Sequence, residues 1–161
     1  MDGGLTVTST DFDEGGLMPR RCTGFGEDIS PAFHIEGLDA AAATLAVILD
    51  DLDVPFAGAL CHWVIWNIPR TADIPSGIPA GETVPGLGGA AQGSAWGKHV
   101  YRGPKQPVVV RNTHRYLFSF YALDTSLALP PSAGKKELLE AMRGHIIQTG
   151  HITGLHRRGA N

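Results

Sequence analysis

The sequence predicts a mainly β domain with antiparallel sheets, one long loop and one helix close to its C-terminal end. Glycine and proline, with 21 and 11 residues, are spread along the chain, which favours many short strands joined by turns over a helical bundle. Three apolar runs rich in β-branched and aromatic residues have the composition of buried strands. Only one segment has the apolar spacing of an amphipathic helix.

We expect the three strands at 44–50 (TLAVILD), 61–68 (CHWVIWNI) and 115–123 (RYLFSFYAL). The alanine-rich segment 38–43 runs directly into the first strand and is too short for a stable helix, so a loop is expected there. The connection 69–113 shows little periodicity. A connection this long inside a compact domain is usually either functional or disordered, and its aromatic residues at 96 and 101 favour a functional one.

The helix is expected at 134–148 (GKKELLEAMRGHIIQ), followed by a last strand at 151–155 (HITGL). Its apolar residues recur at the spacing that forms one stripe along a helix. The stripe consists of Leu138, Leu139, Met142 and Ile146.

Length and charge limit the class of protein. A chain of 161 residues is long enough for one sizeable core, so we expect a single domain over 1–161. The 13 basic residues are outnumbered by 16 acidic ones, and the net charge of -3 argues against nucleic acid as a partner. The one basic cluster, His156-Arg157-Arg158, is expected to be a solvated tail.

Location and redox state follow from what the sequence contains. No run approaches the roughly 18 apolar residues of a membrane span, and the acidic N-terminal segment lacks the apolar core of a signal peptide. Cys22 and Cys61 are too few for a disulfide framework and lack the spacing of a zinc site. The sequence therefore predicts a cytoplasmic protein without an integral membrane segment.

Strand alternation places a polar residue at one end of each predicted strand. Asp51 ends an apolar row, and His62 shares a face with Val64. His114 and Tyr116 begin the row that contains the phenylalanines of the third strand. Each of these residues taken alone is explained as well by a structural role. Because burying such groups is costly unless they pair with one another or with a ligand, the threefold repetition predicts a shared pocket.

Two neighbouring aspartates flank this predicted site. Asp53 lies two residues beyond Asp51, so it either points into the same pocket or caps the turn before Pro55. Asp50 is expected to face the opposite side of the strand.

The same residues resemble the two signatures of the phosphatidylethanolamine-binding protein family. The first signature is matched by Asp51-Leu-Asp-Val-Pro55 and His62-Trp63. The second is matched by Tyr101-Arg-Gly-Pro104 and His114-Arg-Tyr116. The flanking segments LTVTSTDF, FYALD and AMRGHI are similar to those of bacterial and archaeal members.

This resemblance implies a Greek-key antiparallel β-sandwich with a peripheral helix and no cofactor. It also implies a pocket that binds phosphate-like anions, including phospholipid head groups. Carried over by position, the ligand-binding residues are Asp51, Asp53, His62, Gly103, Pro104, His114 and Tyr116. Our hypothesis is that charged His62 and His114 are the main donors, that Tyr116 adds a neutral hydrogen bond, and that the two aspartates orient the histidines.

Two other function classes stay open at this point. A pair of histidines with a carboxylate also suits a metal-dependent or other hydrolytic enzyme, although no Gly-x-Ser-x-Gly elbow is present. Relatives that modulate kinases or inhibit proteases imply a regulatory role with a protein partner. The resemblance also implies a homodimer, for which the apolar run Val108–Val110 is a candidate contact.

Overall fold

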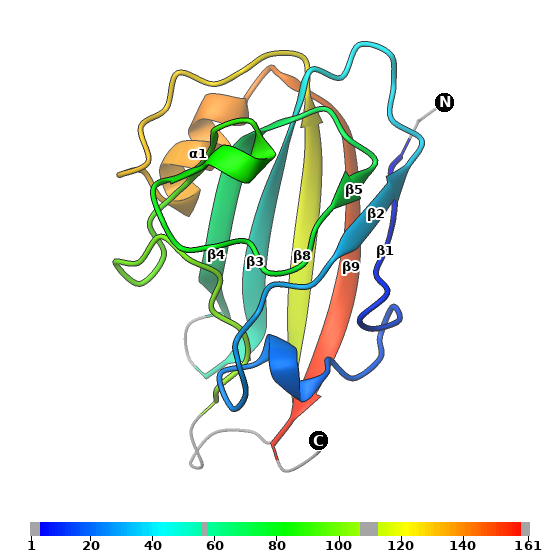
Figure 1. Ribbon diagram of the computed structural model, residues 1–161, viewed down its shortest axis with the longest axis vertical. Helices are drawn as coiled ribbons and strands as arrows, with labels where there is room; N and C mark the ends of the chain where they lie inside the picture. Colours follow the sequence, from blue (N-terminus) through cyan, green and yellow to red (C-terminus); the bar gives the residue numbers. More distant parts are fainter. Residues whose placement is uncertain (1–3, 56–57, 107–112, 159–161) are drawn as a thin grey trace.

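The computed structural model describes residues 4–55, 58–106 and 113–158, which fold into two antiparallel sheets. Figure 1 shows the small sheet in front of the long strands of the large one. In order across the small sheet, the strands are β1 (Thr6–Thr8), β2 (Phe33–Glu36) and β5 (Asp73–Ile74). The large sheet has the order β6 (Thr83–Val84), β7 (Ala90–Gln92), β4 (Gly58–Pro69), β3 (Thr44–Val54), β8 (Thr113–Leu123) and β9 (Ile146–Arg157).

The chain returns across the large sheet after its central hairpin. β3 and β4 form that hairpin, and the long connection after β4 brings β8 back to pair with the other edge of β3. This return to the first strand is the crossing that defines a Greek key. The predicted fold class, an antiparallel β-sandwich with a helix close to the C-terminal end, is confirmed.

Apolar residues fill both faces of the large sheet. The core between the two sheets includes Trp63, Tyr101, Phe118 and Phe120. A second core lies between the opposite face and the helix α1 (Lys135–Met142), with Val64, Trp66, Leu138 and Met142 among its members. Because both faces are covered at the centre of the sheet, β3 and β4 contain continuous buried runs, whereas burial alternates along β8 and β9.

The helix is shorter than its apolar spacing predicts. It ends at Met142, and the prediction that it continues to 148 is wrong. Gly144 has a φ of 82°, a left-handed conformation that ends helices and favours glycine. Ile146 then pairs with Leu123 as the first residue of β9, where its β-branched side chain is well accommodated.

The connection after β4 is less irregular than predicted. It contains β5, β6 and β7 together with a 3-10 turn over Pro85–Leu87. Another 3-10 turn, over Arg20–Cys22, precedes β2. Residues 38–43 form no helix, as predicted. The run Val108–Val110 that we considered for a homodimer contact lies outside the described residues.

Candidate functional site

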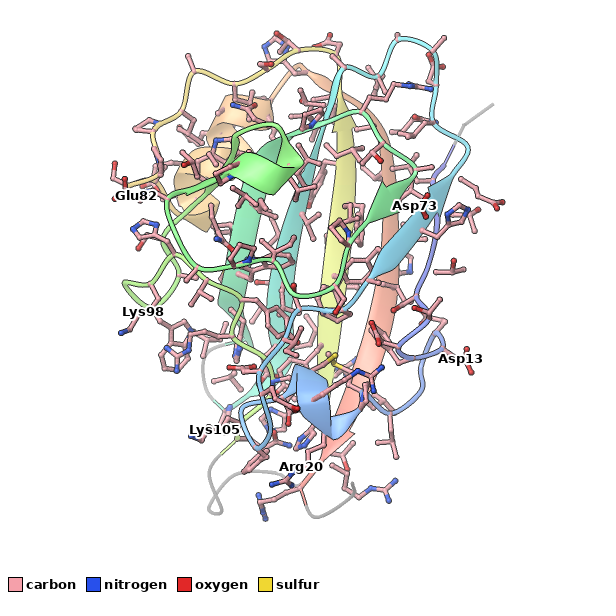
Figure 2. All side chains as sticks on the ribbon, in the orientation of Figure 1. Asp13, Arg20, Asp73, Glu82, Lys98 and Lys105 are labelled. Carbon is pink, nitrogen blue, oxygen red and sulfur yellow. The ribbon has the colours of Figure 1, made fainter. Side chains whose placement is uncertain are left out.

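A pocket of about 250 Å³ opens at the end of the large sheet where β3 ends and β8 begins. Figure 2 shows Lys105, one of its lining residues, at this end of the molecule. Of the predicted site residues, the pocket brings together Asp51, His62, Gly103, His114 and Tyr116. It adds residues from the connection before β8 that were not predicted to bind ligand, namely Trp96, Arg102, Lys105 and Gln106.

Asp51 and His114 form a buried pair in the wall of this pocket. The Asp51 Oδ2 atom lies 2.7 Å from His114 Nδ1, and the two side chains are 5% and 2% exposed. The other carboxylate oxygen accepts the backbone N–H of Asp53 at 2.9 Å. In the described part of the chain, His114 Nε2 is the one buried side-chain nitrogen or oxygen without a hydrogen-bond partner.

This unsatisfied nitrogen is the most informative feature of the site. Buried polar atoms in proteins are nearly always hydrogen-bonded, because leaving one without a partner costs about 1–3 kcal/mol. Alternation along β8 explains why His114 is buried, since Tyr116, Phe118 and Phe120 follow it on the same inward face. The strand therefore holds His114 at the pocket, where a ligand can supply the missing partner.

A β-bulge in β4 turns the side chain of His62 towards the pocket. The pairing moves from Leu49↔Trp63 to Asp50↔Cys61, so His62 is an extra residue on β4 with no partner of its own. The prediction that His62 shares a face with Val64 is wrong, because Val64 packs in the second core beneath α1. His62 lines the pocket because the bulge interrupts the alternation.

The surroundings of His62 favour its neutral form. Its Nδ1 lies 2.8 Å from the backbone oxygen of Arg102. Its ring contacts the ring of Tyr116 edge-on, with the centroids 5.6 Å apart. Burial lowers the pKa of His62, and this effect outweighs the influence of the nearby Asp51. These surroundings therefore favour a neutral ring at His62 over the expected imidazolium.

Asp53 lies outside the pocket, contrary to prediction. Its carboxylate accepts the backbone N–H of Arg115 at 2.8 Å and the guanidinium of the same residue at 3.0 and 3.1 Å. It therefore orients Arg115, and the expectation that it orients a histidine is wrong.

Gly103 lines the pocket, whereas Pro104, which was also predicted to bind ligand, does not. A Cβ atom on Gly103 would lie 2.1 Å from the backbone oxygen of Cys22, so only glycine fits. The Gly103 N–H donates to Asp28 Oδ1 at 2.8 Å and is not free for a ligand. Pro104 is buried behind the wall, where its backbone oxygen accepts the N–H of Gly24 at 2.8 Å.

The hydroxyl of Tyr116 belongs to a hydrogen-bond network in the wall of the pocket. It donates to Gln106 Oε1 at 3.3 Å, and Gln106 Nε2 donates to the backbone oxygen of His156 at 3.2 Å. His156 Nδ1 lies 3.0 Å from the same Gln106 Oε1. In this arrangement the Tyr116 hydroxyl donates to Gln106, and its hydrogen bond to a ligand stays a prediction.

His156 is a buried residue that the sequence prediction missed. It is 5% exposed, pairs across the sheet with His114 and stacks on Phe25 with the ring centroids 5.3 Å apart. The prediction that it belongs to a solvated tail is wrong, because β9 continues to Arg157. Alternation extended along β9 was the signal that could have found it.

Arg102, Lys105 and the exposed indole of Trp96 lie at the rim of the pocket. Trp96 is 52% exposed, has a φ of 59° and donates its indole N–H to the backbone oxygen of Cys61 at 3.0 Å. The guanidinium of Arg102 lies 4.2 Å from the centroid of this ring. Together with Lys105, Arg102 gives the pocket a positive rim that suits an anionic ligand.

Over the described stretches, no three His, Cys, Asp or Glu side chains converge as a group that could hold a metal ion. The expected lack of a cofactor stays a prediction. In the same stretches, no helix is long and apolar enough to cross a membrane.

The fold and the site define a two-sheet antiparallel β-sandwich with a small histidine-containing pocket at one end of its large sheet. A family model for phosphatidylethanolamine-binding proteins matches residues 8–157. The chain belongs to this family.

Similar proteins occur in archaea and bacteria. The UPF0098 protein of Pyrococcus horikoshii is 42% identical over 96% of this chain and 77% of its own length. The UPF0098 protein of Methanothermobacter thermautotrophicus is 42% identical over 92% of this chain and 95% of its own length. The crystal structure of a phosphatidylethanolamine-binding protein homologue from Chlamydia trachomatis superposes with a TM-score of 0.85 and 30% identity, covering 97% of this chain and 99% of that one. E. coli YbcL, at 23% identity and a TM-score of 0.83 over 95% and 98% of the two chains, shares the fold.

Proposed function

We propose that this protein binds a small phosphate-like anion in the pocket between His62 and His114. The observation that carries the proposal is the buried His114 Nε2, which has no hydrogen-bond partner among the described residues although it lines a pocket. An anionic oxygen at this nitrogen would remove the cost of leaving it unsatisfied.

A proton must lie between His114 Nε2 and the oxygen of a bound anion, because both atoms otherwise present lone pairs. The Asp51 carboxylate, 2.7 Å from the other ring nitrogen, stabilises the positive charge that the ring takes on in this complex. The same carboxylate fixes the orientation of the ring. Arg102 and Lys105 at the rim supply further positive charge. Asp51 therefore supports an anion site indirectly, by acting through His114.

A phospholipid head group and a free phosphate ester would present the same chemistry to this pocket. The apolar side chains of Val54, Pro55 and Leu60 also line it and would contact the organic part of such a ligand. No contact in the described part of the chain favours a kinase or protease partner over any other. The proposed function is therefore limited to ligand binding, and the regulatory role, the homodimer and the cytoplasmic location stay predictions.

Calorimetric titration with inorganic phosphate tests the proposal. Replacing His114 by alanine removes a hydrogen bond to a charged group, so we expect the affinity to fall about 10- to 150-fold, which corresponds to about 1.5–3 kcal/mol. The matched control is His145→Ala. His145 pairs with Asp124 at 2.9 Å, but both side chains are 45% exposed, at the far end of β8.

The control variant should bind phosphate as the unmodified protein does. Equal affinity of the His114→Ala variant, with its fold verified by circular dichroism, would contradict the proposal. Failure of the unmodified protein to bind phosphate would also contradict it.

A further inference from the structure

The hydrogen bonds of His62 determine which of its ring nitrogens carries the proton. Its Nδ1 lies 2.8 Å from the backbone oxygen of Arg102. A carbonyl oxygen can only accept a hydrogen bond, so Nδ1 must carry the proton. In the neutral ring Nε2 then bears a lone pair, and no described residue hydrogen-bonds to it. His62 therefore offers a ligand an acceptor.

His114 is arranged differently. Its Nδ1 donates to the Asp51 carboxylate, which stabilises positive charge on the ring when an anion lies at Nε2. His62 Nδ1 donates to the carbonyl oxygen of Arg102 instead of to a carboxylate, and this hydrogen bond favours the charged ring less than burial disfavours it. The two histidines thus form an asymmetric pair in which His114 suits an anionic oxygen and His62 suits a donor.

The charged groups around His62 act in opposite directions. Asp51 from β3 and Asp28 from the loop before β2 raise its pKa, whereas the positive charge of Arg102, from the connection before β8, lowers it. Burial has the largest influence, and it lowers the pKa of His62 below its ordinary value.

His114 is faced by Asp51, by the stacked ring of Tyr116 at 6.2 Å and by His156 from β9. Burial lowers the pKa of His156, so this neighbour stays neutral near pH 7. The Tyr116 hydroxyl does not replace the missing donor, because its proton is directed at Gln106.

We infer that the pocket selects anions that carry an acidic proton of their own, such as the monoanion of a phosphomonoester, over anions without one, such as a phosphodiester or sulfate. This inference rests on the proposed anion-binding function. A phosphomonoester monoanion has both a charged oxygen for His114 and a P–OH group that donates to His62 Nε2. A phosphodiester has the same charge but places an oxygen lone pair against the lone pair of His62.

The matched probes are methyl phosphate and dimethyl phosphate, titrated calorimetrically at pH 6.0 and pH 7.5. Because the second pKa of a phosphomonoester is about 6, about half of the methyl phosphate has its proton at pH 6.0 and most of it has lost this proton at pH 7.5. We expect methyl phosphate to bind about 10-fold or more tightly than dimethyl phosphate at pH 6.0, as is typical when a buried acceptor is left without a donor. The affinity for methyl phosphate should fall on going to pH 7.5.

Proton uptake provides a second measurement. At pH 7.5 the binding of methyl phosphate should take up about one proton more than the binding of dimethyl phosphate, because the site requires the protonated ligand while His114 takes up its own proton with either probe. The dependence of the measured heat on the ionisation enthalpy of the buffer should therefore be larger for methyl phosphate. An equal dependence for the two probes would overturn the inference.

A variant locates the selectivity at His62. The amide of a His62→Gln variant can donate as well as accept, so the preference for methyl phosphate over dimethyl phosphate should shrink. His145→Gln, remote from the pocket, should leave the preference unchanged. Equal affinity of the unmodified protein for both probes would overturn the inference while preserving the anion-binding function. Binding of neither probe, nor of inorganic phosphate, would overturn both.

Discussion

Asp50 and Asp51 are consecutive residues of β3, and their carboxylates lie on opposite faces of the large sheet. Both residues are nearly buried, with 7% and 3% of their surface exposed. Asp50 accepts hydrogen bonds from Lys135 at both oxygens, at 3.0 and 2.9 Å, and so ties α1 to the sheet. Asp51 binds His114 on the other face, inside the pocket.

The two pairs differ in what the partner of the carboxylate can still contact. Lys135 has 32% of its side chain exposed, so its remaining ammonium proton can contact water. His114 is 2% exposed, and its second nitrogen has only the pocket beside it. The Asp50–Lys135 pair is therefore structural on one face, and on the other the Asp51–His114 pair leaves an incomplete hydrogen-bond network that a ligand can complete.

The largest effect is expected from removing the two carboxylates in turn. Asp51→Ala leaves the Nδ1–H of His114 and the backbone N–H of Asp53 without an acceptor, so the free energy of unfolding should fall by about 2–5 kcal/mol. Asp50→Ala should cost about 1 kcal/mol, because the partly exposed Lys135 can turn to water. Urea unfolding measures both values. Equal losses of unfolding free energy in the two variants would show that the different exposure of Lys135 and His114 does not distinguish the pairs.

A smaller effect is expected from pH. Burial lowers the pKa of His62 below the value of about 6.5 that it has in the unfolded chain, so the unfolded state takes up the proton first. The stability that neutral His62 contributes above this pH is lost as the pH falls from there towards its folded pKa. The free energy of unfolding, measured from pH 7.5 to pH 5.5, should therefore fall less steeply in a His62→Gln variant.

The comparison with this variant is needed because other histidines titrate in the same range. Burial also lowers the pKa of His156, which adds a slope of the same sign. A hydrogen bond to Asp73 raises the pKa of His34, which adds a slope of the opposite sign. Only the difference between the unmodified protein and His62→Gln isolates His62, and identical slopes would contradict a neutral buried ring.

The smallest effect is expected at the exposed pair of Arg115 with Asp53, the aspartate that was predicted to line the pocket. Arg115 is 56% exposed, so breaking its contact with Asp53 in an Arg115→Gln variant should cost about 0.2–1 kcal/mol. Phosphate affinity should stay within about twofold, since neither residue lines the pocket. Arg143→Gln, in a loose exposed pair with Glu140, is the control for a surface charge. A tenfold loss of affinity in Arg115→Gln alone would return Asp53 to the site.

The parts of the site that follow simple periodicity could be predicted from the sequence. Alternation along β8 correctly places His114 and Tyr116 on the inward face, and alternation along β3 correctly separates Asp50 from Asp51. The same rule failed where the backbone departs from ideal pairing. Register shifts on β3 and β4 bring His62 into the pocket, and a further shift lies between Asp51 and Val54, beside Asp53.

The remainder depends on contacts that no local pattern encodes. Arg102 and Gln106 lie in an irregular segment. Arg102 contacts Trp96 within that segment, and Gln106 hydrogen-bonds to His156 on β9, 50 residues further along the chain. The end of α1 could not be predicted from apolar spacing, because Ile146 continues that spacing beyond Gly144 although it belongs to β9. Periodicity reports which face is apolar, but it does not report where a left-handed glycine changes the structure from helix to strand.

The central claim is that His114 Nε2 is the atom that an anion contacts. Nuclear magnetic resonance of protein labelled with ¹⁵N in its histidine rings tests this claim at the atom itself. We expect added inorganic phosphate to shift the Nε2 resonance of His114 progressively, while the ring resonances of the exposed His145 stay in place. A His114 Nε2 resonance that does not move while phosphate binds elsewhere, or that moves no more than that of His145, would contradict the account.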